Sequence, residues 1–217
     1  LNKARVLDLQ GKPEDAEQEY RAAMQANPKS IEPHLLLLQS FLRRRQWDAA
    51  IQGTQAAFAV DAKSARVHNL LGAAFLGKKD LGQAEKAFRA AAEADRKYLP
   101  ALLNLAHLAL QQKKFDEAER QARLASEVAP NDLLPMFSLA SVLTAQGKLP
   151  EAIQRLEAAI ALNPDLLILQ LSLADLYLRT GRLGEAQVAA ERLLAVNPKL
   201  APVLVIHGTV FLQRARL

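Results

Sequence analysis

Two histidines, His34 and His68, are the first residues to consider for chemistry, because a pair of imidazoles can hold a metal ion. They lie 34 residues apart and occupy the same place in two neighbouring helical segments, so their rings would be able to approach each other. The alternative is that both fill a structural position early in a helix. The sequence has no cysteine to add thiolate ligands. We favour the structural interpretation and predict no metal site.

Catalytic motifs are missing from the sequence. Without cysteine there is no disulfide, thiolate metal site or cysteine nucleophile, and both a periplasmic and a cytoplasmic location stay open. The chain also lacks a glycine-rich phosphate loop, a paired-histidine zinc motif and a nucleophile elbow. We therefore predict no catalytic residue, no cofactor and no enzymatic activity.

The chain carries 28 Lys and Arg against 23 Asp and Glu, and this net charge of +5 raises the question of a nucleic-acid partner. Basic residues such as Arg43–Arg45 and Lys113–Lys114 fall where one helix of each pair should end, and acidic residues such as Asp48 and Asp116 begin the next. Each helix end is then charged as its dipole prefers. Aromatic side chains make up only 5% of the chain, too few for extensive base stacking. We predict solvated capping charge and no nucleic-acid partner.

The elements that carry these side chains are helices, arranged in a pattern that repeats every 34 residues. In residues 133–164, two apolar stripes at helical spacing are separated by Gly147 and ended by Asn163-Pro164. One small residue marks the same place in every repeat: Ala16, Ala50, Ala84, Ala118, Ala152 and Ala186. It indicates that two helices cross closely there. One hairpin cannot bury both stripes, so stacked copies are expected.

Glycine, aromatic, alanine and proline residues follow one another in the order of a known repeat family. They are Gly72, Phe75, Ala84 and Phe88 in the third repeat, and Tyr177, Gly181, Ala186 and Pro198 in the sixth. With them the whole chain resembles the tetratricopeptide repeat family, in the form common in long bacterial proteins. The resemblance implies an all-α fold, a right-handed superhelical solenoid of antiparallel helix pairs. We predict a single array over residues 1–217, with about six repeats and a terminal helix. The predicted repeats are 1–30 (partial), 31–64, 65–98, 99–132, 133–166, 167–200 and 201–217 (first helix only).

The resemblance also implies a binding surface, because the first helices of such arrays line a concave groove that receives a peptide or a partner's helix. The groove positions of this chain are mostly apolar, with a narrow line of polar side chains among them. The predicted partner-binding residues are Leu35, Gln39, Leu42, Arg66, Asn69, Asn104, His107, Phe137, Ser138, Ser141, Asp175 and Leu178. We expect a non-enzymatic scaffold that binds an amphipathic helix or an extended apolar segment of a partner protein.

A clamp for a partner's terminal carboxylate is not expected. In the family, such a clamp consists of Lys and Asn residues four positions apart on successive first helices. Asn69 and Asn104 lack the matching lysines, and Arg66 stands three residues from Asn69. Recognition of an acidic C-terminal tail is therefore not predicted.

Residues 201–217 predict a seventh first helix that is apolar nearly all round. Because an array normally ends in a polar face, we expect the chain to be a fragment of a longer array. The alternatives are self-association through this helix, or stacking as a module of a larger complex such as envelope export machinery. The longest apolar run, 166–173, is interrupted by Gln170 and falls far short of the ~20 residues that span a bilayer, so membrane insertion is not predicted.

Overall fold

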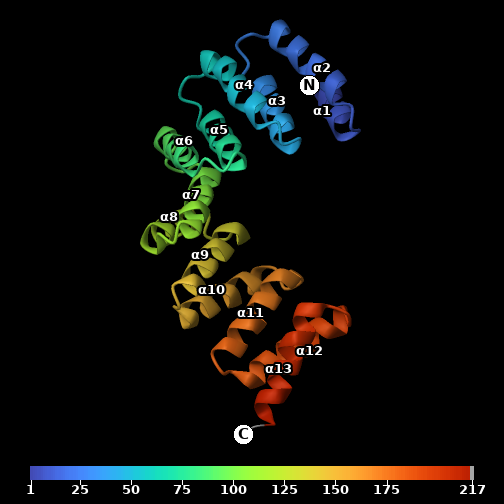
Figure 1. The fold of residues 1–217 in the computed structure, drawn as a ribbon, viewed down its shortest axis with the longest axis vertical. Helices are drawn as coiled ribbons and strands as arrows, with labels where there is room; N and C mark the ends of the chain where they lie inside the picture. The colour runs from blue at the N-terminus through green and yellow to red at the C-terminus, as the bar shows by residue number, and fades with distance from the viewer. Residues whose placement is uncertain (216–217) are drawn as a thin grey trace. The chain divides into compact units, whose positions relative to one another are not determined.

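The computed structural model describes residues 1–215, which form thirteen α-helices and no β-strand (Figure 1). The predicted all-α fold is confirmed. Residues 216 and 217, which belong to the last predicted repeat, lie outside the described residues. The chain divides into two compact units, Leu1–Leu108 and a second unit that begins at Ala109. None of the helices within residues 1–215 is long and apolar enough to cross a bilayer.

Helices of similar length follow one another throughout both units. The first unit holds α1 (Asn2–Leu9), α2 (Pro13–Ala26), α3 (Glu32–Arg43), α4 (Trp47–Val60), α5 (Ala65–Gly77), α6 (Leu81–Ala94) and most of α7 (Leu99–Gln111). The second holds the end of α7, then α8 (Phe115–Val128), α9 (Leu133–Ala145), α10 (Leu149–Leu162), α11 (Leu167–Arg179), α12 (Leu183–Val196) and α13 (Ala201–Arg214).

The helices pair as hairpins within each unit. In the first unit α1 packs on α2, α3 on α4 and α5 on α6; in the second α9 packs on α10 and α11 on α12 (Figure 1). These five pairs fall within the predicted repeats 1–30, 31–64, 65–98, 133–166 and 167–200, whereas 201–217 contains α13 alone. The assignment of all repeats to one array stays a prediction.

The alanine that recurs every 34 residues is buried in every copy. All six copies are at most 1% exposed. In the first unit, α5 and α6 show how little room there is, because a Cβ added at Gly72 would lie 2.5 Å from ring atoms of Phe88. A larger side chain at these places would push the two helices apart. The small residues therefore set the hairpin geometry that brings the first helices side by side.

The turn inside each hairpin uses a left-handed residue at the same place in every repeat. The residues with positive φ are Gly11, Arg45, Lys79, Lys113, Gly147 and Gly181, again 34 apart, with φ between 58° and 80°. Glycine adopts this conformation without a steric penalty, whereas the three basic residues do so at a cost of about 1 kcal/mol each. Those basic residues were predicted only as charges that complement the helix ends, so the structure adds a backbone role for them.

Candidate functional site

The first helices of the second unit surround one pocket, which we name the α9–α11–α13 pocket. It has a volume of about 570 Å³. Its lining residues are Phe137, Ala140, Ser141 and Thr144 of α9, Leu156 of α10, Leu171, Ser172, Asp175 and Leu176 of α11, and Pro202, Val205 and Ile206 of α13. Two consecutive hairpins and the single helix α13 thus contribute to one surface.

Two interactions hold the helices of this pocket against their neighbours. Below α9, the Glu119 carboxylate of α8 accepts hydrogen bonds from Lys148 Nζ at 2.7 Å and Gln146 Nε2 at 2.8 Å, and it also pairs with Arg123. The Lys148 ammonium, then Arg123 and Gln146, lower the pKa of Glu119 to about 2, so the carboxylate is ionised at neutral pH. This cluster fastens the turn after α9 to α8.

Tyr177 fastens α11 to α10. Its hydroxyl donates to Glu157 Oε1 at 2.7 Å, and the Arg182 guanidinium lies over its ring, 4.4 Å from the centroid. Burial, followed by the bond to Glu157, raises the pKa of Tyr177 to about 12, so the hydroxyl keeps its proton. The pocket is therefore built on helices that are fixed by polar contacts behind it.

Apolar side chains supply most of the pocket wall, and several of them are open to solvent. Val205 is 68% exposed, while Phe137 and Leu171 are half-buried. One turn earlier on the same helix faces, Leu134 is 64% exposed and Ile168 is 56% exposed. These side chains lie on the first helices α9, α11 and α13, where a partner's apolar side chains can cover them.

The polar groups of the pocket are three hydroxyls and one carboxylate. Ser141 Oγ donates to the Phe137 carbonyl at 2.8 Å, Thr144 Oγ1 to the Ala140 carbonyl at 2.7 Å, and Ser172 Oγ to the Ile168 carbonyl at 2.8 Å. Each hydroxyl therefore bonds within its own helix. The fourth group, the half-exposed Asp175, has an ion pair with Arg179 one turn later at 3.7 Å.

Three predicted site residues, Phe137, Ser141 and Asp175, line this pocket. Ser138 and Leu178 lie on the same helices, half-buried, outside the lining set. Val205 and the other α13 residues were not among the predicted site residues, because residues 201–217 were expected to be an incomplete repeat of a longer array, with self-association as the alternative. The 34-residue spacing places Pro202, Val205 and Ile206 at the positions of Ile168, Leu171 and Ser172, and this signal was sufficient to find them.

In the first unit, three predicted polar residues, Arg66, Asn69 and Asn104, are bonded to one another or to neighbours across hairpins. Arg66 of α5 forms a two-pronged ion pair with Glu32 of α3, at 2.8 and 3.3 Å. Asn104 Nδ2 of α7 donates to Asn69 Oδ1 of α5 at 2.9 Å, and Asn69 is itself buried. These residues join successive first helices. His107 of α7 is exposed.

Leu35 is a correction to the predicted surface. Its side chain is 0% exposed and belongs to a core cluster with Leu38, Ala57 and Val67. Val67 and Leu70 of α5 and Ala57 and Phe58 of α4 belong to the same packed cluster, so Leu35 has no surface to offer a partner. The two other predicted residues of α3, Gln39 and Leu42, are half-buried, and Leu42 packs against the neighbouring core cluster.

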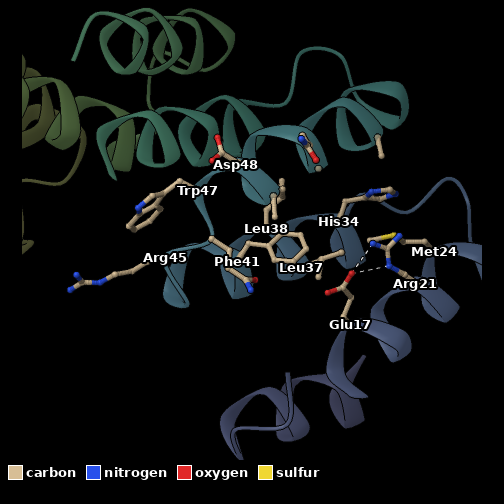
Figure 2. Close-up of a pocket in the computed structure, with 15 residues that line it drawn as sticks. Glu17, Arg21, Met24, His34, Leu37, Leu38, Phe41, Arg45, Trp47 and Asp48 are labelled. Atoms are coloured by element: carbon tan, nitrogen blue, oxygen red, sulfur yellow. Dashed lines mark hydrogen bonds and ion pairs between the residues drawn. The ribbon is translucent and has the colours of Figure 1, made fainter. Parts of the chain in front are cut away.

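A second hollow, of about 670 Å³, lies in the first unit over α2, α3 and α4. Figure 2 shows Phe41 at its centre, Trp47 on one side and His34 with Met24 on the other. The Glu17–Arg21 pair, at 2.7 Å, lies at its edge (Figure 2). This hollow involves the second helices α2 and α4, so it is separate from the predicted groove.

The two histidines that were considered as metal ligands, His34 and His68, have different surroundings. His34 is buried on α3 beside this hollow, and burial lowers its pKa. His68 packs its ring against Phe58, with 4.6 Å between centroids, and burial again lowers its pKa. Both imidazoles are thus neutral packing groups at pH 7. Within residues 1–215, no group of three or more His, Cys, Asp or Glu side chains is placed to hold a metal ion.

Solved structures with this arrangement of helices are numerous. PilW, a widely conserved type IV pilus biogenesis factor, has a TM-score of 0.79 at 18% identity, covering 94% of this chain and 95% of PilW. PilF of Pseudomonas aeruginosa has a TM-score of 0.76 at 20% identity, covering 95% and 94%. YrrB, a tetratricopeptide repeat protein with an unusual peptide-binding site, has a TM-score of 0.67 at 17% identity, covering 85% and 95%. At these identities the likeness shows the fold.

The sequence has no significant match among curated proteins. The family described as Tetratricopeptide repeat matches residues 9–74, 75–141 and 143–203, which together make up most of the sequence. This match confirms the resemblance seen in the sequence. The hairpins, the buried alanines and the repeated turns agree with it. The chain belongs to the tetratricopeptide repeat family.

Proposed function

We propose that this chain is a non-enzymatic scaffold that binds a segment of a partner protein in the α9–α11–α13 pocket. Proteins of this family are generally non-catalytic scaffolds that bind protein partners. The observation that carries the proposal is the exposed apolar face made by Leu134, Phe137, Ile168, Leu171 and Val205 on three successive first helices. YrrB, a protein of similar fold, has a peptide-binding site, which gives the proposal general support.

The size of the pocket sets the length of the partner segment. Packed helices lie about 8–10 Å apart, so three successive first helices span roughly 20 Å. An extended segment of about six residues, or a helix of about thirteen, crosses that distance. Each large apolar side chain that becomes fully buried contributes about 1.5–3 kcal/mol before the entropic cost of association. Two or three such side chains contribute about 3–9 kcal/mol before a cost of about 4 kcal/mol or more, so their burial alone supports weak binding, on the order of 0.1–1 mM at best.

The test uses a library of random twelve-residue peptides displayed on phage and selected against the purified protein. Selected peptides are synthesised, and their affinities are measured for two matched variants, Val205→Ser in the pocket and Val188→Ser on α12. Val188 is 48% exposed and lies outside the pocket lining, so both changes remove an exposed valine from the same unit. The proposal expects Val205→Ser to weaken binding about tenfold and Val188→Ser to have no effect.

Two results would contradict the proposal. Peptides that lose affinity for Val188→Ser and keep it for Val205→Ser would place binding on the second helices. Failure of the library to yield any specific binder, with the protein shown to be folded by circular dichroism, would remove the basis for a peptide-binding role.

Self-association is the alternative function, and the surface of α13 favours it. Phe211 is 71% exposed and Leu212 is 60% exposed, and neither lines the pocket. A second copy of the chain that covered these side chains would form a dimer through α13. Sedimentation equilibrium over a wide concentration range decides this, because a monomer at high concentration excludes the dimer. If a dimer forms, Phe211→Ser is expected to dissociate it.

A further inference from the structure

We infer that the partner segment carries a lysine or arginine whose charged group binds at Asp175. This inference rests on the proposed function and adds the chemistry of the partner to it. The apolar wall of the α9–α11–α13 pocket would accept many apolar segments. The polar groups among the wall residues are what distinguish one segment from another.

Every polar side chain that lines the pocket is presented to a partner as a hydrogen-bond acceptor. Ser141, Thr144 and Ser172 have their hydroxyl hydrogens directed to carbonyls of their own helices, at 2.7–2.8 Å, which leaves oxygen lone pairs. The fourth polar group, the Asp175 carboxylate, offers acceptor oxygens. A complementary group must therefore donate hydrogen bonds. The charged groups of lysine and arginine are donors only, as is the tryptophan indole N–H, and of these the two cations alone carry a charge opposite to that of a carboxylate.

The charge of the lining residues leads to the same partner. Asp175 is the one ionisable side chain among the twelve residues that line the pocket. Its described ion pair, with Arg179, is 3.7 Å long and joins two half-exposed side chains, so it is weak. A cation from the partner gains by approaching Asp175, whereas a carboxylate there is repelled. An acidic segment is thus disfavoured in the same place where a basic one is bound.

The position of Asp175 fits the shape of a long basic side chain. Asp175 follows Leu171 and Ser172 by one turn on α11, and all three line the pocket. The methylene stem of a lysine or arginine can pack along the apolar wall at Leu171 and Val205 while its charged end reaches the carboxylate. One side chain of the partner then uses both the apolar and the acceptor character of the pocket.

The experiment extends the peptide selection with a charge test. Peptides selected on the protein are sequenced, and the strongest binder is synthesised with its basic residue and with norleucine, which keeps the stem and removes the charge. Affinities are measured for the unmodified protein, for Asp175→Asn and for Asp165→Asn. Asp165 is an exposed carboxylate of the same unit that does not line the pocket, so it controls for a general loss of negative charge.

The inference expects lysine or arginine at one enriched position of the selected peptides. Asp175→Asn should weaken the basic peptide about three- to tenfold and leave the norleucine peptide unchanged, and Asp165→Asn should change neither. On the unmodified protein, the basic peptide should bind more tightly than the norleucine peptide, which tests the charge without any variant. Higher salt should weaken only the basic peptide.

Other outcomes separate this inference from the proposed function. Peptides that are weakened by Val205→Ser but contain no enriched basic residue, or that bind Asp175→Asn unchanged, overturn the inference and leave the peptide-binding role in place. Peptides that are insensitive to Val205→Ser, or no binding peptides at all, overturn both. Binding to the chain itself, seen as peptides that copy its own sequence, also overturns the inference of a separate basic partner.

Discussion

Replacing Glu119 by Gln is expected to destabilise the second unit at neutral pH and to have little effect in acid. The folded protein lowers the pKa of this carboxyl from 4.5 to about 2, chiefly through Lys148, then Arg123 and Gln146. At 1.36 kcal/mol per pKa unit, the shift corresponds to about 3 kcal/mol. Lys148 and Arg123 are 43% and 45% exposed, and solvent screening at these partners reduces the expected loss to about 1–2 kcal/mol.

The direction of the pH dependence follows from the lowered pKa. A carboxyl that ionises more readily in the folded state stabilises it fully above pH 4.5, and this contribution disappears as the pH falls toward 2. The difference in unfolding free energy between the unmodified protein and Glu119→Gln should therefore be constant from pH 7 to about 5. It should then fall by more than about half by pH 3.

Urea denaturation followed by far-ultraviolet circular dichroism at pH 7, 5, 4 and 3 measures this difference. Glu127→Gln is the control, because Glu127 is an exposed carboxyl on the same helix, α8. It should change the stability by no more than about 0.5 kcal/mol at any of these pH values. A loss at Glu119→Gln that is the same at pH 7 and pH 3 would refute the reasoning, since the effect would then be one of packing rather than charge.

Two further predictions concern the backbone of the repeats. Gly147→Ala should lower the stability by about 1 kcal/mol, because Gly147 has a positive φ and the space around it is open, so only the backbone conformation opposes the new Cβ. Lys79→Gly should raise the stability by about 0.5–1 kcal/mol, because Lys79 has a positive φ that glycine adopts more easily. Both changes are measured by thermal denaturation. Equal and small effects of the two changes would contradict a conformational origin. Gly72→Ala should cost about 1–3 kcal/mol by the same assay, because the new Cβ would meet the Phe88 ring at 2.5 Å. A variant as stable as the unmodified protein would show that the ring moves aside freely.

The fold was predictable because the sequence itself contains the packing constraint. A residue that stays alanine at every thirty-fourth position shows that two helices cross there, and burial of all six alanines follows from that crossing. The left-handed turn was predictable only in the repeats that have glycine there. Gly147 and Gly181 marked it, but the equivalent positions at Arg45, Lys79 and Lys113 carry charges that have an independent explanation at helix ends. Side-chain type alone did not reveal the backbone conformation that they share.

The candidate site was predictable by position but not by exposure. Phe137 and Leu35 occupy the same place in different repeats, 102 residues apart, yet Phe137 lines a pocket and Leu35 is covered by Val67 and its neighbours. The difference depends on the size of the side chains on adjacent helices, which repeat position does not encode. Asn69 and Asn104 were also predicted on first helices, and they lie on α5 and α7. Their mutual hydrogen bond was not predicted, because it joins positions 35 residues apart, one beyond the repeat spacing.

The contrast between the polar groups of the two units gives a physical reason for placing the partner on the second. On the first helices of the first unit, Ser40 donates to Asp8 at 2.7 Å, Arg66 pairs with Glu32, and Asn104 donates to Asn69, so these groups are used in joining hairpins. A partner that engaged them would first have to break such contacts, and a buried group left unpaired costs about 1–3 kcal/mol. The hydroxyls of Ser141 and Ser172 bond only within their own helices, so their oxygens accept a partner's donors without any loss between hairpins. In the first unit these polar groups thus join the hairpins to one another. In the second unit the hydroxyl oxygens of Ser141 and Ser172 stay available as acceptors for a partner.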